Sequence, residues 1–226
     1  MPPLTRLAVF DVDGTLIDSQ HNIVASMVQA CERSGVSAPP PEAIRRIIGL
    51  SLLEAVTTLL PGADPASVLR VVEAYKSSFQ ELRSRADHFE PLFPGVMEAL
   101  DALEADGWIL AVATGKSRRG LLMMIERHGL EGRFVSLQTA DDNPGKPHPA
   151  MLRRALDEAG AKADEAVMIG DTSYDMQMGR SAGVRAVGVG WGYHTPAELL
   201  AAGADLIVES YPHLVGVLPT LLVQAQ

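Results

Sequence analysis

The stretch Val9–Ser19, which reads VFDVDGTLIDS, decides how this chain is interpreted. An apolar run of strand length, Leu7–Phe10, is followed by Asp11 and Asp13, one residue apart, and then by a Gly-Thr pair. Two carboxylates this close repel each other, so the arrangement is costly unless something makes use of it. The candidate uses are a bound cation, a covalent carboxylate chemistry, or a polar turn with no further role.

The composition indicates a globular protein and argues against a nucleic-acid partner. The 226 residues can bury a sizeable core, without low-complexity runs or a repeat period. The net charge of −9 argues against a nucleic-acid surface, and the single cysteine, Cys31, excludes an internal disulfide and thiolate zinc sites. Because no signal peptide or membrane-spanning run is recognisable, we expect a cytoplasmic protein without a membrane partner. We expect the protein to be a monomer or a homodimer.

From Leu92 onward the chain alternates apolar, strand-like runs with helix-like segments. The runs are WILAVATG, FVSLQTA, AVMIGD, RAVGVGWG and ADLIVES. This alternation predicts an α/β fold, with a Rossmann-like doubly wound parallel sheet covered by helices on both faces. The opening strand RLAVF belongs naturally to the same sheet.

The segment between the opening strand and Leu92 contains helix-like pieces and no comparable strand. Its apolar residues fall at helical spacing, and Pro and Gly separate the pieces. We therefore expect an all-helical domain over residues 19–91, inserted into a core formed by residues 1–18 and 92–226. The hinges are expected near Ser19 and around Phe89–Pro94. Asp18 and Ser19 are candidates to cap the first inserted helix, and the alternative for Ser19 is to line the entrance to the site.

Polar residues follow several of the expected strands. In an open parallel sheet, ligands bind beyond the carboxyl ends of the strands, where the connecting loops gather. The residues expected to meet at this edge are Asp11, Asp13, Thr114, Gly115, Lys146, Asp171 and Asp175.

This set of groups suits a phosphoryl group held by a cation. Several carboxylates call for a hard divalent cation, and Mg²⁺ prefers oxygen ligands. Lys146, the Thr114 hydroxyl and backbone N–H groups near Gly115 would hold an anion beside it. One aspartate of the first motif could attack phosphorus, while the other protonates the leaving oxygen and then deprotonates water.

Four segments in order along the chain, DVDGTL, ATGKS, GKPHP and GDTSYD, resemble the haloacid-dehalogenase-like hydrolase superfamily. The position of the helical insertion resembles that of its phosphoglycolate-phosphatase-like branch, in which a cap follows the first motif. By this resemblance Asp11 is the nucleophile and a Mg²⁺ ligand, and Asp13 is the general acid/base, with its backbone carbonyl on the metal.

The resemblance also implies roles for the later motifs. Thr114 would bind the phosphoryl oxygens, and Lys146 would orient the nucleophile and neutralise charge. Asp171 would ligate Mg²⁺ directly, and Asp175 would support the ion through water or a neighbouring ligand.

Differences from other branches favour a phosphatase. Dehalogenases lack the second acidic residue of the first motif, and ion-pumping ATPases carry a lysine where this chain has Val12. Sugar phosphomutases retain both aspartates, but their cap usually offers an arginine at a position occupied here by Leu52. Arg45 and Arg46 remain as candidates to bind the substrate, for example the carboxylate of 2-phosphoglycolate.

The expected function is therefore a Mg²⁺-dependent phosphomonoesterase with an aspartyl-phosphate intermediate, acting on a small metabolite and most simply on 2-phosphoglycolate. The alternatives are a sugar phosphomutase, a phosphatase of nucleotides, sugar phosphates or pyrophosphate, and a non-enzymatic regulator in which Asp11 accepts phosphate as a signal. An intact Asp13 and a helical cap argue against the regulator, because a stable signal needs neither.

Overall fold

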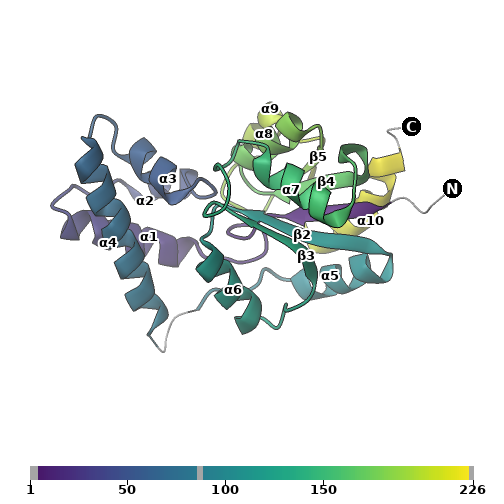
Figure 1. The fold of residues 1–226 in the computed structure, drawn as a ribbon, viewed down its shortest axis with the longest axis horizontal. Coiled ribbons are helices and arrows are strands. Elements are labelled where there is room, and N and C mark those ends of the chain that lie inside the picture. The colour runs from purple at the N-terminus through teal and green to yellow at the C-terminus, as the bar shows by residue number, and fades with distance from the viewer. Residues whose placement is uncertain (1–4, 86–88, 224–226) are drawn as a thin grey trace.

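The computed structural model describes residues 5–85 and 89–223 and contains a six-stranded parallel sheet (Figure 1). The strands are β1 (Arg6–Phe10), β2 (Trp108–Thr114), β3 (Phe134–Thr139), β4 (Ala166–Gly170), β5 (Arg185–Val189) and β6 (Leu206–Val208). Their spatial order is β3-β2-β1-β4-β5-β6. The α/β, doubly wound, Rossmann-like fold expected from the sequence is confirmed.

Helices cover both faces of this sheet. On one face α5 (Val96–Ala105), α6 (Arg118–Arg127) and α10 (Tyr211–Val223) pack against Ala8 and Phe10 of β1. On the other, α7 (Ala150–Ala159) and α8 (Ser173–Ala182) pack against Leu7 and Val9, and α9 (Pro196–Ala202) packs beside α8. Because alternate residues of a strand point to opposite faces, the continuous apolar run of β1 is buried from both sides.

The strand order places the direction reversal of the sheet at β1 and β4. The chain moves outward from β1 through β2 to β3, and then returns to the other side of β1 with β4. Phe10 of β1 lies in register with Ile169 of β4, so Asp11 and Asp171 leave neighbouring strands at almost the same level. The reversal point of a doubly wound sheet is where its ligands bind.

The first four helices after β1 lie apart from the sheet and form a hydrophobic cluster of their own (Figure 1). They are α1 (Gln20–Arg33), α2 (Pro41–Arg46), α3 (Leu52–Leu59) and α4 (Pro65–Arg83). Met27 and Ala30 of α1 pack with Val68 and Val71 of α4 in this cluster. The helix-like pieces expected from residue spacing therefore fold as helices, and we call α1–α4 the helical segment.

One local expectation is wrong. Ser19 stands at the N-cap position of α1, but its side chain makes no capping hydrogen bond. Its hydroxyl is directed instead toward Asp13, which accepts a hydrogen bond of 2.6 Å from it. The charge of a nearby carboxylate makes this bond stronger than a neutral capping bond.

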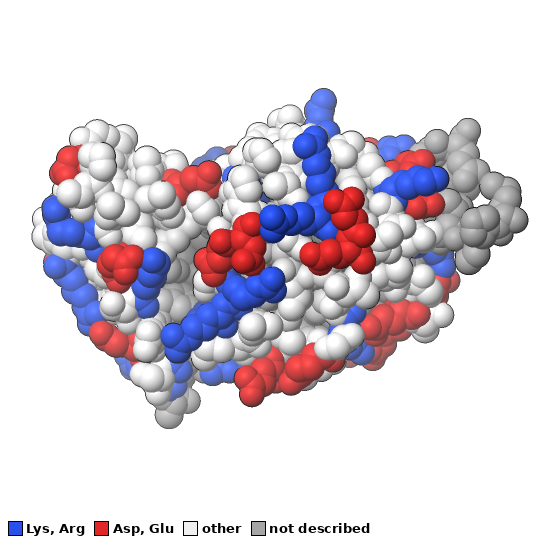
Figure 2. Space-filling model, in the orientation of Figure 1, with Lys and Arg blue, Asp and Glu red and all other residues white. Residues whose placement is uncertain are grey.

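Two further observations concern the surface. On the face drawn in Figure 2, acidic and basic side chains are interspersed. Among the described residues, none of the helices combines the length and apolar character required to cross a membrane.

Candidate active site

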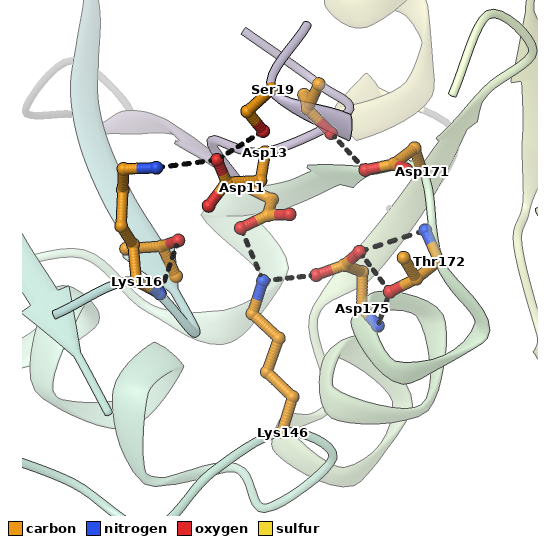
Figure 3. A network of polar contacts seen from close by, with 10 residues as sticks. Asp11, Asp13, Ser19, Lys116, Lys146, Asp171, Thr172 and Asp175 are labelled. Atoms are coloured by element: carbon orange, nitrogen blue, oxygen red, sulfur yellow. Dashed lines mark hydrogen bonds and ion pairs between the residues drawn. The ribbon is translucent and has the colours of Figure 1, made fainter. Parts of the chain in front are cut away.

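Three buried carboxylates meet at the carboxyl end of β1 and β4. One oxygen from each of Asp11, Asp171 and Asp175 lies within 4.8 Å of the others, and all three residues are fully buried. Figure 3 shows these side chains around a common point beyond the strands. The structure thus brings together residues that lie 160 or more positions apart in the sequence.

Lys146 joins the cluster from the loop between β3 and α7. Its Nζ lies 2.7 Å from Asp11 Oδ1 and 2.6 Å from Asp175 Oδ1, and the whole side chain is buried (Figure 3). A buried ammonium is tolerated only where opposite charges compensate its desolvation. Burial lowers the pKa of Lys146, but the charges of Asp11 and Asp175 outweigh it, so the net shift is upward and the lysine stays charged.

The chain around β4 holds the other two carboxylates in place. Asp175 forms a capping box with Thr172 at the start of α8, accepting from its backbone N at 3.0 Å and its Oγ1 at 2.6 Å. Asp171 accepts hydrogen bonds from Thr15 Oγ1 and from the backbone N of Tyr193, both at 2.9 Å. Asp175 therefore combines the helix-capping role that its position allows with a charged contact to Lys146.

A left-handed turn at Gly14 allows the first motif to approach Asp171. Its φ is +90°, and an added Cβ would lie 2.2 Å from Asp171 Oδ2. Only glycine can adopt this backbone conformation, and lie this close to Asp171, without strain.

Asp13 is directed away from the three-carboxylate cluster. Its Oδ1 accepts from Ser19 Oγ at 2.6 Å and lies 2.7 Å from Lys116 Nζ (Figure 3). The carboxylates of Asp11 and Asp13 thus occupy separate environments, which answers why the first motif contains two: one faces the cluster and Lys146, the other faces Ser19 and Lys116. The Asp13 side chain is outside the set that could share one ion.

Sequence reasoning missed Lys116. The residue lies within the ATGKS segment, but its role could not be derived from β-strand ends, because it stands two residues beyond Thr114. The backbone N of Lys116 donates to Thr114 Oγ1 at 3.2 Å, which fixes the turn and directs the side chain to Asp13. The positive charge inside the motif was the one available indication.

The charges of the cluster shift the pKa of its members. Burial raises the pKa of Asp11 to about 7; the ammonium of Lys146 opposes this, and the charge of Asp175 adds to it. Burial also raises the pKa of Asp171 well above its ordinary value, with the charges of Asp11 and Asp175 acting in the same direction. One ammonium does not compensate three buried carboxylates, so the cluster lacks positive charge.

A divalent cation fits this deficit. Asp11 Oδ2 is buried and accepts no hydrogen bond from the residues that the structure describes, whereas Asp11 Oδ1 contacts the ammonium of Lys146. A buried carboxylate oxygen without a donor is costly unless it binds a cation. Oxygen ligands from Asp11, Asp171 and Asp175 are the type that Mg²⁺ takes, with water and substrate oxygens completing the coordination.

The loop before α3 lies directly on the core. A Cβ on Gly115 would lie 2.6 Å from the backbone oxygens of Gly49 and Leu50, and a Cβ on Gly145 would lie 2.2 Å from Glu54 Oε2. Gly115 and Gly145 flank Thr114 and Lys146, so the segment 49–54 covers the edge of the site. Thr114 itself is buried at the end of β2.

The two arginines considered for substrate binding have other contacts. Arg45 Nε donates to Gln20 Oε1 at 3.0 Å, and its guanidinium lies 3.7 Å from Glu42. Arg46 pairs with Glu198 of α9, and 61% of its side chain is exposed. In this structure Arg46 therefore links the helical segment to the core at the surface.

A family model described as haloacid dehalogenase-like hydrolase matches residues 8–189. The relatives include "Probable phosphatase IndB" of Dickeya dadantii, 36% identical, with 96% of this chain and 94% of the relative covered. A phosphoglycolate phosphatase of Vibrio parahaemolyticus is 28% identical, with 94% and 95% covered. The pyrophosphatase PpaX of Bacillus pumilus is 30% identical, with 88% and 93% covered. The match spans all the strand ends described above except that of β6.

Proposed function

The chain belongs to the haloacid dehalogenase-like hydrolase family, and we propose that it is a Mg²⁺-dependent phosphatase of small phosphorylated metabolites. The observation that carries the proposal is the division of the carboxylates: Asp11, Asp171 and Asp175 share one buried cluster with Lys146, while Asp13 faces Lys116. The names of relatives that act as phosphatases support the same reaction class.

In the proposed reaction, a carboxylate oxygen of Asp11 attacks phosphorus and the bond to the ester oxygen breaks, which gives an aspartyl phosphate. Asp13 protonates the departing alcohol oxygen. Asp13 then accepts a proton from water as the water oxygen attacks phosphorus; the bond between phosphorus and the Asp11 oxygen breaks, and inorganic phosphate is released. Asp11, which contacts Lys146, is thereby the nucleophile. Asp13, which contacts Ser19 and Lys116, transfers the protons.

The remaining residues bind and orient the phosphoryl group. A bound Mg²⁺, held by Asp11, Asp171 and Asp175 with the backbone carbonyl of Asp13, would neutralise phosphoryl charge. Lys146 fixes Asp11 through the contact of 2.7 Å and adds positive charge. Thr114 and the backbone at Gly115 border the position where phosphoryl oxygens would lie, and donors placed there stabilise the charge that develops during transfer.

Residues 19–91 serve, in this proposal, as a cap on a core of residues 1–18 and 92–226. The support is the separate hydrophobic cluster of the helical segment and the contact of Gly49 and Leu50 with Gly115. A closed cap excludes bulk water from the aspartyl phosphate and places cap side chains over the leaving group.

The preferred substrate is proposed to be 2-phosphoglycolate, the substrate in the name of one relative. Pyrophosphate is the principal alternative, because another relative is a pyrophosphatase. Nucleoside monophosphates and sugar phosphates are further alternatives.

The test is phosphate release from 2-phosphoglycolate, pyrophosphate, nucleoside monophosphates, sugar phosphates and ethyl phosphate, with Mg²⁺ and with a chelator. We expect release that depends on Mg²⁺ and a kcat/KM that is highest for 2-phosphoglycolate. Absence of release from every compound would overturn the phosphatase proposal. Isomerisation of a sugar phosphate without release of phosphate would identify a mutase instead.

A further inference from the structure

One face of α4 is turned toward Asp13. Tyr75, Phe79 and Arg83 follow one another at intervals of four residues, so their side chains share that face. The Tyr75 and Phe79 rings are stacked at 5.6 Å, and the Arg83 guanidinium carbon lies 4.5 Å from the Phe79 centroid. Burial, followed by the negative charges of Asp13 and Glu90, raises the pKa of Tyr75, which agrees with this orientation.

Lys116 approaches the same ring from the core. Its Nζ lies 5.7 Å from the Phe79 centroid, 2.7 Å from Asp13 Oδ1 and 4.0 Å from Glu90 Oε1. A Cβ on Gly120 would lie 2.7 Å from Arg83 Nη2 and 3.2 Å from Lys116 Cγ. The side chains of Arg83 and Lys116 therefore lie side by side over Gly120, one from the helical segment and one from the core.

We propose that Arg83 and Lys116 form the subsite that recognises a carboxylate on the leaving alcohol of the substrate. The inference rests on the proposed phosphatase function. Lys116 is next to the residue that protonates the leaving oxygen, so a group attached to that oxygen through one or two carbons reaches the Phe79 side of Asp13. Arg83 then offers a planar set of donors that matches a carboxylate.

Charged groups of both signs surround the subsite. Lys116 lies beside Asp13 and Glu90, and Glu90, in the expected hinge, is 6% exposed. Arg83, Glu126 and Arg127 line the adjoining cavity. The nearest carboxylates, Asp13 and Glu90, contact Lys116, so the guanidinium of Arg83 is the group proposed to pair with a carboxylate of the substrate.

Burial is the main influence on Arg83, and it lowers the pKa of the guanidinium, while the charges of Glu90 and Asp13 raise it. Arginine remains charged in such surroundings. A weakly hydrated, partly buried guanidinium binds a carboxylate more strongly than an exposed one such as that of Arg46.

A cavity of about 310 Å³ adjoins the subsite, and Arg83, Glu90, Gly120, Met123 and Met124 are among its lining residues. Asp13 and Lys116 are not among the residues that line it, so in this proposal the leaving group extends past Lys116 to reach the cavity beside Arg83. Its methionines would contact the carbon atoms of an acid longer than glycolate.

The decisive experiment compares 2-phosphoglycolate with ethyl phosphate, which has the same number of carbons and lacks the carboxylate. In the Arg83→Gln variant, we expect kcat/KM for 2-phosphoglycolate to fall roughly 10- to 100-fold, the range for a charged hydrogen bond, while that for ethyl phosphate changes less than about threefold. Arg83→Lys should keep part of the preference for 2-phosphoglycolate over ethyl phosphate. Arg70→Gln, at an exposed arginine of the same helix that donates to Ser67, is the matched control and should alter the hydrolysis of neither substrate.

Equal losses for both substrates, or a loss of preference in Arg70→Gln, would overturn the subsite. If the unaltered protein hydrolyses neither of these two compounds, the subsite is judged by calorimetric binding of 2-phosphoglycolate to the Asp11→Asn variant with and without Arg83→Gln, while the phosphatase proposal is judged separately on the full set of phosphate compounds. Binding that is unaffected by Arg83→Gln would remove the subsite independently of turnover.

Discussion

The edge of the sheet and the helical segment use charge in opposite ways. At the sheet edge Lys146, Asp11 and Asp175 are fully buried and held by contacts of 2.6 to 2.7 Å. In the helical segment, the side chains of Arg45 and Arg46 are 35% and 61% exposed and form surface contacts. Buried charges are retained at a cost in stability, so a cluster of them indicates chemistry, whereas surface pairs contribute little.

The difference teaches where each part of the function is encoded. The groups that would transfer phosphate lie at the ends of β1 and β4, on the loop before α7 and in the first turn of α8, joined by buried contacts with Lys146. The groups that would select the substrate come partly from α4, whose position depends on how the helical segment packs. Chemistry and selectivity should therefore respond differently to substitution, as the following changes test.

The largest effect is expected for Asp11→Asn. Without a nucleophilic oxygen, kcat should fall roughly 10⁴-fold or more, as for nucleophiles of other covalent hydrolases. The fold should be retained, because asparagine keeps the shape of the side chain. Phosphate release and a thermal unfolding curve check both statements, and retained turnover would exclude Asp11 as the nucleophile.

Lys146→Met should weaken both stability and activity. It leaves Asp11 and Asp175 buried without their shared cation, and removal of one member of such a buried group costs about 3–5 kcal/mol of unfolding free energy. Denaturant unfolding in the presence of chelator measures this cost. Lys162→Met, at the exposed start of the 3-10 helix before β4, is the control and should change little. Equal stability of the two variants would contradict a structural role for Lys146.

Cation binding should depend on pH. The pKa of Asp11 is raised from 3.8 to about 7 in the folded protein. A proton is then bound in the folded state and not in the unfolded state, so the stability of the metal-free protein decreases as pH rises from about 4 to 7.

Mg²⁺ needs the ionised carboxylate, so protons compete with it below pH 7. Its affinity should be about tenfold lower at pH 6 than at pH 8, and its stabilisation of the protein correspondingly smaller. Thermal unfolding with and without Mg²⁺ at the two pH values measures this. A Mg²⁺ effect that is larger at pH 6 would contradict the direction.

Gly115→Ala tests the contact between the two regions. Its Cβ would lie 2.6 Å from the oxygens of Gly49 and Leu50, so the backbones must separate, at a cost of about 1–3 kcal/mol. We expect kcat/KM to fall roughly tenfold through poorer cap closure. Gly216→Ala, which meets no atom within 4 Å, is the control. A fall in both variants would point to a general effect of added side chains.

The smallest effect, on the free energy of unfolding, is expected for Arg46→Gln. Its pair with Glu198 is at the surface, and such pairs contribute about 0–1 kcal/mol. A double-mutant cycle with Glu198→Gln isolates the coupling. A coupling well above that range would show that this surface pair helps to hold the helical segment on the core.

Much of the molecule could be predicted from local sequence. The apolar runs gave the strands, helical spacing gave α1–α4, and parallel strand ends necessarily meet at one edge, so Asp11, Lys146, Asp171 and Asp175 were expected together. These features could be predicted because each depends only on residues close together in the sequence and on general rules of sheet geometry.

Contacts between side chains of the two regions could not be predicted from local sequence. Ser19 bonds Asp13 rather than its own helix, Lys116 pairs with Asp13, and Arg83 rather than Arg45 lies near that pair. None of these contacts follows from spacing, because the angle at which α4 meets the core is fixed by packing of many apolar residues far apart in the chain. Local patterns in the sequence therefore predict the fold and the set of groups at the sheet edge, whereas the packing of α4 on the core decides which cations lie beside Asp13.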